Sequence, residues 1–247
     1  MRIASLVPSL TELLFALGLG PQVVARTGFC IHPREARTVP KIGGTKDPDL
    51  GKLRALAPTH LVVNVDENRR EDVDAAREFV PNIVVTHPLE PADNAGLFAM
   101  FGAAFDCRDR ADALVAQLQA SIAEVEDAVR GVARERVLYL IWRKPWMTIS
   151  RATYVSASLA MVGWDSVPAN SAARYPVLGE EDAAWRDAQR VLLSSEPYAF
   201  RERDVREMKE RHGKPVALVD GEWTSWYGVR AIEGLRSLAR FRLTKAP

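Results

Sequence analysis

One uninterrupted helical stretch, residues 109–130, sets the strongest limit on how this chain folds. It contains no glycine or proline, and Leu114, Leu118 and Val125 are among the apolar residues that recur through it at helical spacing. A helix of about 22 residues is roughly 33 Å long, about the width of a small domain. It is either a peripheral surface helix or a connection between two lobes. We favour the connection, because an alternation of strands and helices restarts immediately after it.

On both sides of this helix, short apolar runs alternate with amphipathic segments. Strands are predicted at 3–7, 23–25, 61–65, 83–86, 136–142, 191–194 and 216–220. Helices are predicted at 11–17, 47–57, 69–79, 92–105, 153–162, 180–188, 201–211 and 229–241. We expect Pro8 and Ser9 to break the first strand before a helix that starts at Thr11. Asp47 is the predicted N-cap of the second helix, with Pro48 in its first turn.

Such a β-α-β series predicts parallel sheets with right-handed crossovers. The predicted fold class is therefore α/β, with two parallel-sheet α/β lobes bridged by one long helix. We expect an N-terminal lobe at 1–106, the interlobe helix at 107–134 and a C-terminal lobe at 135–247.

Composition and charge exclude several classes of protein. Apolar residues make up 47% of the 247 residues, and the net charge of +1 comes from mixed charges without a basic patch for nucleic acid. No apolar run approaches the roughly 20 residues of a transmembrane helix.

We see no export signal, so we expect a cytoplasmic location for the chain as written, or a periplasmic one if a signal was trimmed. We also expect a monomer.

The aromatic residues are confined to one half of the chain. All the tryptophans and tyrosines lie after residue 135, and four of the tryptophans sit just past predicted strands. Aromatic residues in loops at strand ends are typical of the wall of a ligand site. Trp164 and Trp185 are exceptions, because they lie in or beside predicted helices and are expected to pack in the core.

Open parallel sheets bind ligands beyond the carboxyl ends of their strands, which gives a list of candidate binding residues. In the first lobe they are Phe29, Cys30, His32, Thr45, Lys46, Asn64 and Glu67. In the second lobe they are Trp142, Arg143, Trp146, Arg174, Tyr175, Tyr198, Glu222, Trp223, Trp226 and Tyr227. If the two rims face each other, they form a cleft with one polar wall and one aromatic wall. Arg143 and Arg174 are suited to pair with a carboxylate or phosphate, or to stack on a ring.

A metal site is an alternative that stays open. Cys30 and His32 are two residues apart in a loop and carry soft and borderline ligand atoms, and Glu67, His87 or Glu222 would complete a site across the cleft. Alternatively, Cys30 or His32 approaches the metal centre of a ligand as an axial partner. Cys30 and Cys107 lie far apart in the sequence, which predicts two free thiols.

Enzymatic motifs are absent from the sequence. It contains no G-x-S-x-G elbow, no Walker loop and no H-E-x-x-H pair. The motifs therefore give no support for an enzyme. A cytoplasmic enzyme on a chelatase-like scaffold is the remaining alternative, and it is supported by fold analogy alone.

Four motifs, taken together, resemble a known family. The run IASLVPSLTEL at 3–13 contains a strand, a Pro-Ser pair and a T-E-L helix start. VPKIGGTKDPDLGKLRALAPTHLVV at 39–63 contains a Gly-Gly loop, a P-D-L helix and a strand, and the RVLYLIW and VALVDGEW strands follow in the second half. In this order they resemble the class III solute-binding proteins, the family of vitamin B12, haem and ferric-siderophore receptors of ABC importers. The likeness covers nearly the whole chain and is greatest to the B12 binders and to similar helical-backbone metal receptors.

The resemblance implies two lobes bridged by a helix, with a ligand enclosed between them and no catalysis. By position, the rings that flank a corrin fall on His32 and Tyr175, and a ligand-contacting acid falls on Glu222. Two first-lobe tryptophans of the B12 binders fall on Thr45 and Val65, so a corrin would lose stacking surface there.

The resemblance also implies docking on an ABC permease through one acidic residue on each lobe. Glu181 matches the second-lobe position, whereas Gly51 replaces the first-lobe acid. The resulting expectation is a receptor for cobalamin, haem or a similar metal chelate that requires no cofactor of its own. Its pocket is expected to be apolar on the second lobe and to carry thiol, imidazole, amide and acid groups on the first, which suits a ligand with one flat face and one polar or metal-bearing face.

Overall fold

The computed structural model describes residues 1–244, and their contacts divide the chain into two compact units. Unit 1 contains Met1–Pro88, Asn94–Gln117 and Tyr227–Arg230. Unit 2 contains Leu89–Asp93, Leu118–Trp226 and the residues from Ala231 onward. The chain therefore passes from one unit to the other more than once. The domain boundaries expected from the sequence stay a prediction, and residues 245–247 of the expected second lobe lie outside the described residues.

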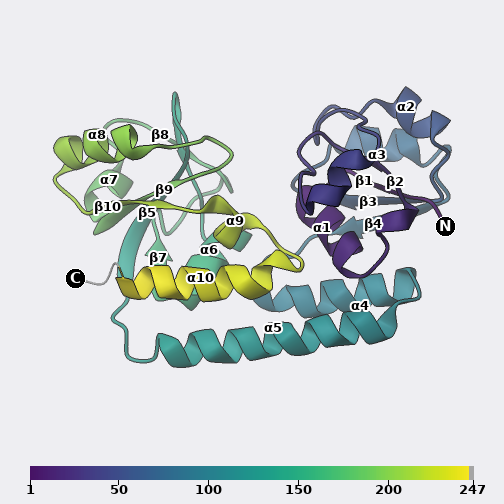
Figure 1. Cartoon of the computed structure of the whole chain (residues 1–247). Coiled ribbons are helices and arrows are strands. Elements are labelled where there is room, and N and C mark those ends of the chain that lie inside the picture. The colour runs from purple at the N-terminus through teal and green to yellow at the C-terminus, as the bar shows by residue number, and fades with distance from the viewer. Residues whose placement is uncertain (245–247) are drawn as a thin grey trace. The chain divides into compact units, whose positions relative to one another are not determined.

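Unit 1 is built around a four-stranded parallel sheet in the order β2-β1-β3-β4. Its strands are β1 (Ile3–Ser5), β2 (Val23–Arg26), β3 (His60–Asn64) and β4 (Asn82–Thr86). Its helices are α1 (Pro8–Ala16), α2 (Leu50–Ala55), α3 (Arg70–Ala76) and α4 (Asn94–Ala104), with 3-10 turns at Gly20–Gln22 and Arg34–Thr38. Ala4, Leu61 and Val63 from the strands pack with Leu53 of α2 and Ala76 of α3 in a buried core (Figure 1).

The predicted long helix is confirmed as α5, which runs from Arg108 to Ala128. Leu118 and Val125 are buried, as their helical spacing predicts. The part of α5 up to Gln117 belongs to unit 1, and the part from Leu118 belongs to unit 2.

Unit 2 is a six-stranded mixed sheet in the order β10-β9-β5-β6-β8, with β7 paired to β5. Its strands are β5 (Glu135–Trp142), β6 (Trp146–Thr148), β7 (Trp164–Ser166), β8 (Val177–Leu178), β9 (Arg190–Ser194) and β10 (Val216–Val219). Its helices are α6 (Tyr154–Met161), α7 (Ala183–Asp187), α8 (Glu202–His212), α9 (Gly221–Ser225) and α10 (Arg230–Thr244), with a 3-10 turn at Pro91–Asp93. The predicted α/β class is confirmed, but β6 and β8 are antiparallel, so this sheet is not purely parallel.

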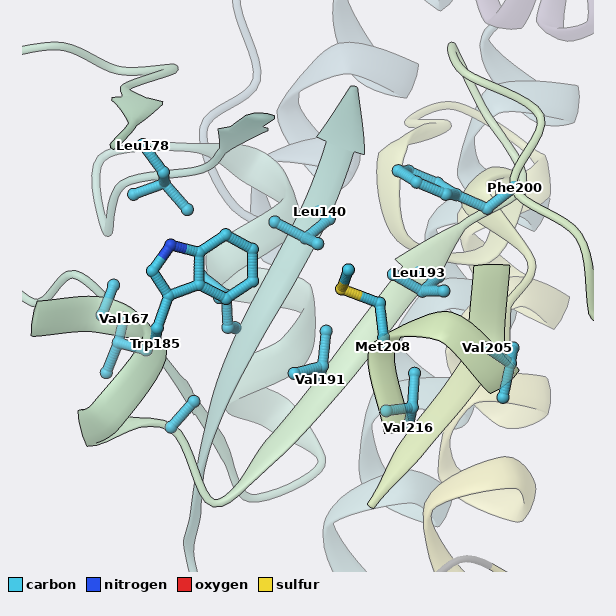
Figure 2. Close-up of a cluster of buried hydrophobic side chains, with 13 residues drawn as sticks. Leu140, Val167, Leu178, Trp185, Val191, Leu193, Phe200, Val205, Met208 and Val216 are labelled. Carbon is cyan, nitrogen blue, oxygen red and sulfur yellow. The ribbon is translucent and has the colours of Figure 1, made fainter. Parts of the chain in front are cut away.

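Figure 1 shows α7 and α8 on one side of the unit 2 sheet and α6 and α10 on the other. The α7 and α8 side carries a large core, in which Trp185 lies between Leu178 and Val167 while Met208 and Phe200 pack near Leu193 (Figure 2). The predicted core role of Trp185 is confirmed by its exposure of 7%, and that of Trp164 by complete burial. Core packing thus explains the positions of two of the six tryptophans, and no ligand is needed to explain them.

Two helix starts differ from the prediction. The first helix, α1, begins at Pro8, whereas the sequence predicted that Pro8 precedes a helix starting at Thr11. Proline is tolerated there because the N–H that it lacks would have no partner within the first turn of a helix. The N-cap of α2 is Asp49 and not Asp47, since the Asp49 carboxylate accepts a hydrogen bond from the Lys52 N–H at 2.9 Å. Pro48 precedes the helix and forms a bridge with Gly43.

In the part of the chain that the structure describes, no helix combines the length and apolar character that a membrane span requires.

Candidate functional site

The carboxyl end of the unit 1 sheet holds a buried group of hydroxyls around one thiol. The Thr11 hydroxyl lies 2.8 Å from Ser5 Oγ and 3.1 Å from Cys30 Sγ, and the Thr27 hydroxyl lies 3.2 Å from the same sulfur. Cys30 is fully buried, and burial raises the pKa of its thiol. A metal ligand or nucleophile has to be a thiolate, so this environment favours a structural role for Cys30.

The loop that follows β3 is fixed by the amides of two asparagines. The Asn64 N–H donates to Asn68 Oδ1 at 2.9 Å, and Asn68 Nδ2 donates to the Thr45 carbonyl at 2.9 Å. Lys46 Nζ donates to the Asp66 carbonyl at 2.7 Å. Three predicted binding residues, Thr45, Lys46 and Asn64, are thus brought together at one end of the sheet.

Glu67 and Tyr227 contact each other, although 160 positions separate them in the sequence. The Tyr227 hydroxyl donates to Glu67 Oε1, and both residues belong to unit 1. Burial, and after it the charge of Glu67, raises the pKa of Tyr227 well above its usual value, so the phenol remains a neutral donor. The sequence prediction assigned Tyr227 to the aromatic wall of the second lobe, but the structure places its ring among unit 1 residues with 6% exposure.

Large apolar side chains are exposed on the same end of unit 1. Phe29, in the loop after β2, is 63% exposed, and Val65, directly after β3, is 54% exposed. Phe29 lies beside the Gly43-Gly44 loop, because a Cβ on Gly44 would come within 3.5 Å of its ring. His32 follows in the same loop as Phe29 and is half-buried. This end of unit 1 therefore offers an apolar surface next to an imidazole.

In unit 2 the predicted aromatic wall divides into an exposed and a buried part. Trp142 ends β5, is 40% exposed and makes an edge contact with Tyr198 at 5.7 Å between ring centroids. Trp146 lies in β6, where its ring stacks on Phe200 and meets the edge of Trp185. Trp142 and Tyr198 remain accessible, whereas Trp146 is largely used by the core.

Arg143 already has two carboxylate partners on α8. Its Nη1 donates to Asp204 at 2.5 Å, and its Nη2 donates to both oxygens of Glu207 at 2.7 and 2.8 Å. The guanidinium also lies 5.4 Å from the centre of the Trp146 ring. A ligand carboxylate would have to compete with these partners for the predicted pairing with Arg143.

A buried acid organises the ends of β9 and β10. Glu196 Oε1 accepts hydrogen bonds from Ser225 Oγ at 2.7 Å and from Trp226 Nε1 at 2.8 Å. Burial raises the pKa of Glu196, and the nearby Glu222 and Asp220 raise it further. Trp226 is only 9% exposed, so its role here is to hold Glu196, while Glu222 stays half-exposed on α9.

The remaining predicted residues differ in their accessibility. Tyr175 is 41% exposed. Arg174 is half-buried, and its carbonyl accepts the Ser150 N–H at 2.8 Å. Trp223 lies on α9, where its ring packs edge-on against Phe241 at 6.0 Å. Sequence reasoning overlooked two apolar residues of this region, the half-buried Met147 and the exposed Val177, because strands of two or three residues have too few positions to show a period.

Among residues 1–244, no group of three or more His, Cys, Asp or Glu side chains is placed to hold a metal ion. The expectation that the two predicted rims form one cleft stays a prediction, as does the assignment of individual binding residues.

The sequence matches one family model over most of its length. A model described as "Periplasmic binding protein" matches residues 3–213. Among curated proteins, the vitamin B12-binding protein of Pectobacterium carotovorum subsp. carotovorum (strain PC1) is 22% identical over 233 residues, which cover 94% of this chain and 84% of that protein.

Solved structures share the fold at low sequence identity. The periplasmic vitamin B12-binding protein of Vibrio cholerae superposes with a TM-score of 0.84 at 16% identity, covering 98% of this chain and 96% of that one. A periplasmic heme-binding protein from Roseiflexus sp. RS-1, in its apo form, gives a TM-score of 0.83 at 22% identity, covering 98% of each chain. These similarities establish the fold and leave the ligand to be argued from the residues.

Proposed function

The chain belongs to the periplasmic binding protein family, and on this basis we propose that it binds a cobalamin, haem or similar metal-bearing tetrapyrrole for import by an ABC permease. The proposal places it outside the cytoplasmic membrane and makes it a receptor that catalyses no reaction. Relatives and structural neighbours named for vitamin B12 and heme support this class of ligand.

The observation that carries the proposal is the exposure of large apolar side chains beside both sheets. Phe29 and Val65 are more than half exposed in unit 1, and Trp142 and Tyr175 are about 40% exposed in unit 2. Leaving such side chains in water has a free-energy cost, and a flat ligand that covers a ring gains both apolar burial and stacking. In our proposal the apolar surface of each unit is a candidate to cover a ring of the ligand.

His32 is the residue that we propose to approach the metal of the ligand. It is half-buried and lies in the loop that also carries the exposed Phe29. A neutral imidazole is a common axial partner of haem iron, and it also suits cobalt. Cys30 is a weaker candidate, because its thiol is buried and its pKa is raised.

The same properties of Cys30 weigh against direct binding of a free metal ion. A Cys30→Ser variant distinguishes binding of a free metal ion from binding of a metal-bearing ligand, because an ion held by the thiolate would be lost from the purified variant. Metal content measured by elemental analysis, unchanged between wild type and variant, would remove the free-ion alternative.

Docking on the permease is proposed through Glu181, which is exposed just before α7. The matching position in unit 1 is Gly51, exposed on α2, and it carries no side-chain charge. We therefore propose that unit 2 provides the principal ionic contact with the permease.

Titration with cobalamin and with haem tests the proposed function. Binding at micromolar concentration should shift the absorbance of the chromophore and quench tryptophan fluorescence. Trp142→Ala and Phe29→Ala should each weaken binding, and Met100→Ala, an exposed apolar change on α4, serves as the control. If neither chromophore shifts its spectrum or quenches fluorescence, the proposal is wrong.

A further inference from the structure

A row of apolar side chains crosses three strands of the unit 2 sheet. Trp142 of β5 is in register with Met147 of β6, and Met147 is in register with Val177 of β8. Residues directly opposite each other on neighbouring strands point to the same face of a sheet. Trp142, which follows a register shift in β5, is 40% exposed and Val177 is 56% exposed, while Met147 between them is half-buried. This row, the apolar strip, therefore reaches solvent at Trp142 and at Val177.

The opposite face of the same strands is already filled. Trp146 is in register with Leu178, and both belong to the core that packs on Trp185 and Phe200. Figure 2 shows Leu178 pointing toward Trp185 in that core. The alternation along β6 and β8 therefore places Trp146 and Leu178 on the core face and Met147 and Val177 on the other face of these strands.

A cavity of about 460 Å³ begins at the end of the same two strands. It is lined by Ser150, Arg151, Ala152, Ala169, Asn170, Ser171 and Ala172. Ser150 lies three positions beyond Met147, which is roughly 10 Å along an extended strand. The Ser150 N–H donates to the carbonyl of Arg174, so the cavity lies near the chain segment that carries the exposed Tyr175 and, two residues on, Val177 of the apolar strip.

The cavity carries one positive charge and no negative one. Arg151 is the charged residue in its lining, and Asn170, Ser150 and Ser171 add amide and hydroxyl groups. Within residues 1–244, Arg151 takes part in no salt bridge. A neighbouring acid, Asp165, is already held by Arg134 through bonds of 2.9 and 2.6 Å. An arginine beside hydroxyl and amide donors is a chemical match for a carboxylate.

We propose that the apolar strip and this cavity form one bipartite subsite for a flat macrocycle with carboxylate arms. The strip covers one face of the ring, and Arg151 receives a carboxylate arm in the cavity. This inference rests on the proposed function and narrows it to a porphyrin with free carboxylates, such as haem. The side arms of a corrin are neutral amides and do not need the charge of Arg151.

The experiment compares three chromophores on the full chain: haem, haem dimethyl ester and cobalamin. Arg151→Glu should weaken haem binding by roughly tenfold to a hundredfold, because it replaces a charge-assisted hydrogen bond with repulsion. Binding of the dimethyl ester, which has no free carboxylate, should be weaker in wild type and should not change in the variant. Arg206→Glu, an exposed charge reversal on α8 outside the cavity lining, should leave all three affinities unchanged.

A second pair of variants tests the apolar strip separately. Val177→Asp should weaken haem and its ester alike, since both present the same flat ring, and Val85→Asp on β4 is the matched exposed control. Far-UV circular dichroism and thermal midpoints check that the variants fold.

The outcomes separate this inference from the proposed function. If haem binds but neither Arg151→Glu nor esterification alters its affinity, the carboxylate subsite is wrong and the proposed function stands. If cobalamin binds and haem does not, the carboxylate subsite is likewise wrong and the proposed function stands. If no chromophore binds, both fail.

Discussion

At the scale of single residues, Glu135 neutralises the buried positive charge of unit 2. Its two carboxylate oxygens accept from Arg190 Nε and Trp164 Nε1, each at 2.9 Å, and Arg242 Nη1 lies 3.4 Å away. Arg190 and Arg242 are less than 10% exposed. Two buried guanidinium groups therefore share one carboxylate, and burial lowers the pKa of Arg242.

Glu135→Ala should destabilise unit 2 by about 3–5 kcal/mol, because it removes the carboxylate that two buried guanidinium groups share. Urea denaturation followed by tryptophan fluorescence measures the loss. Glu233→Ala removes an exposed carboxylate that pairs with Arg240 and should cost less than about 1 kcal/mol. Similar losses for the two variants would show that the Glu135 cluster is not a charge-balancing centre.

Glu196 gives unit 2 a pH dependence with a definite sign. Its folded pKa is raised by burial, so the folded state holds the proton more tightly than the unfolded state. The stability that this residue contributes is fully present below its unfolded pKa and is lost as the pH rises through its folded pKa. Wild type should therefore lose stability relative to Glu196→Gln as the pH rises above the ordinary glutamate pKa of about 4.3.

Urea denaturation of both proteins at several pH values above this pKa tests that prediction. The glutamine keeps an oxygen to accept from Ser225 and Trp226 but does not ionise. Glu210→Gln, an exposed change on α8, is the control and should show no trend. A stability difference that is constant with pH would contradict the assigned role of Glu196.

At the scale of secondary-structure elements, the short hairpin from β5 into β6 places one tryptophan in the core and another at the surface. Trp146 lies under Phe200 and beside Trp185, whereas Trp142 contacts Tyr198 at the surface. We predict that Trp146→Ala costs about 3 kcal/mol of unfolding free energy and leaves a cavity in the core. Trp142→Ala should cost less than about 1 kcal/mol and should act on ligand binding instead.

Chemical denaturation and ligand titration on both variants measure this division. If Trp142→Ala is as destabilising as Trp146→Ala, the exposed face of the hairpin is structural.

Sequence patterns predicted the longer elements well and the short ones poorly. The α5 helix has enough turns for its apolar period to be seen, so residues 109–130 were sufficient to predict it. The two-residue β8 and three-residue β6 and β7 have no such period and form only because neighbouring strands provide hydrogen-bond partners. The error at Asp47 has a related cause, since Asp47 and Asp49 both qualify as N-caps and only the fold selects one.

At the scale of the whole molecule, the path of the chain could not be deduced from local patterns. Residues 227–230 belong to unit 1, although the residues before and after them belong to unit 2. Gly228 shows how closely this segment fits: its φ is +84°, and a Cβ there would lie 3.3 Å from the Ser9 carbonyl oxygen. The Gly228 N–H donates to Asn94 Oδ1 at 2.5 Å. Phe29 and Glu67 lie in the loops after β2 and β3, where their sequence context predicts them, but the pairing of Glu67 with Tyr227 needed the tertiary fold.

The return of the chain into unit 1 is fastened by Arg230, which forms two hydrogen bonds with the Glu12 carboxylate at 2.9 and 2.6 Å. Both side chains are mostly buried, with exposures of 25% and 18%, so this pair is less screened than a surface ion pair. We predict that Arg230→Ala destabilises unit 1 by about 1–3 kcal/mol, since Glu12 loses a bidentate partner.

Amide hydrogen exchange should accelerate in α1, which carries Glu12. Arg240→Ala, which breaks an exposed pair with Glu233, should leave exchange in α1 unchanged. Equal protection of α1 in the wild type and in Arg230→Ala would show that residues 227–230 are held by their other contacts, with Glu67 and Asn94, and not by this ion pair.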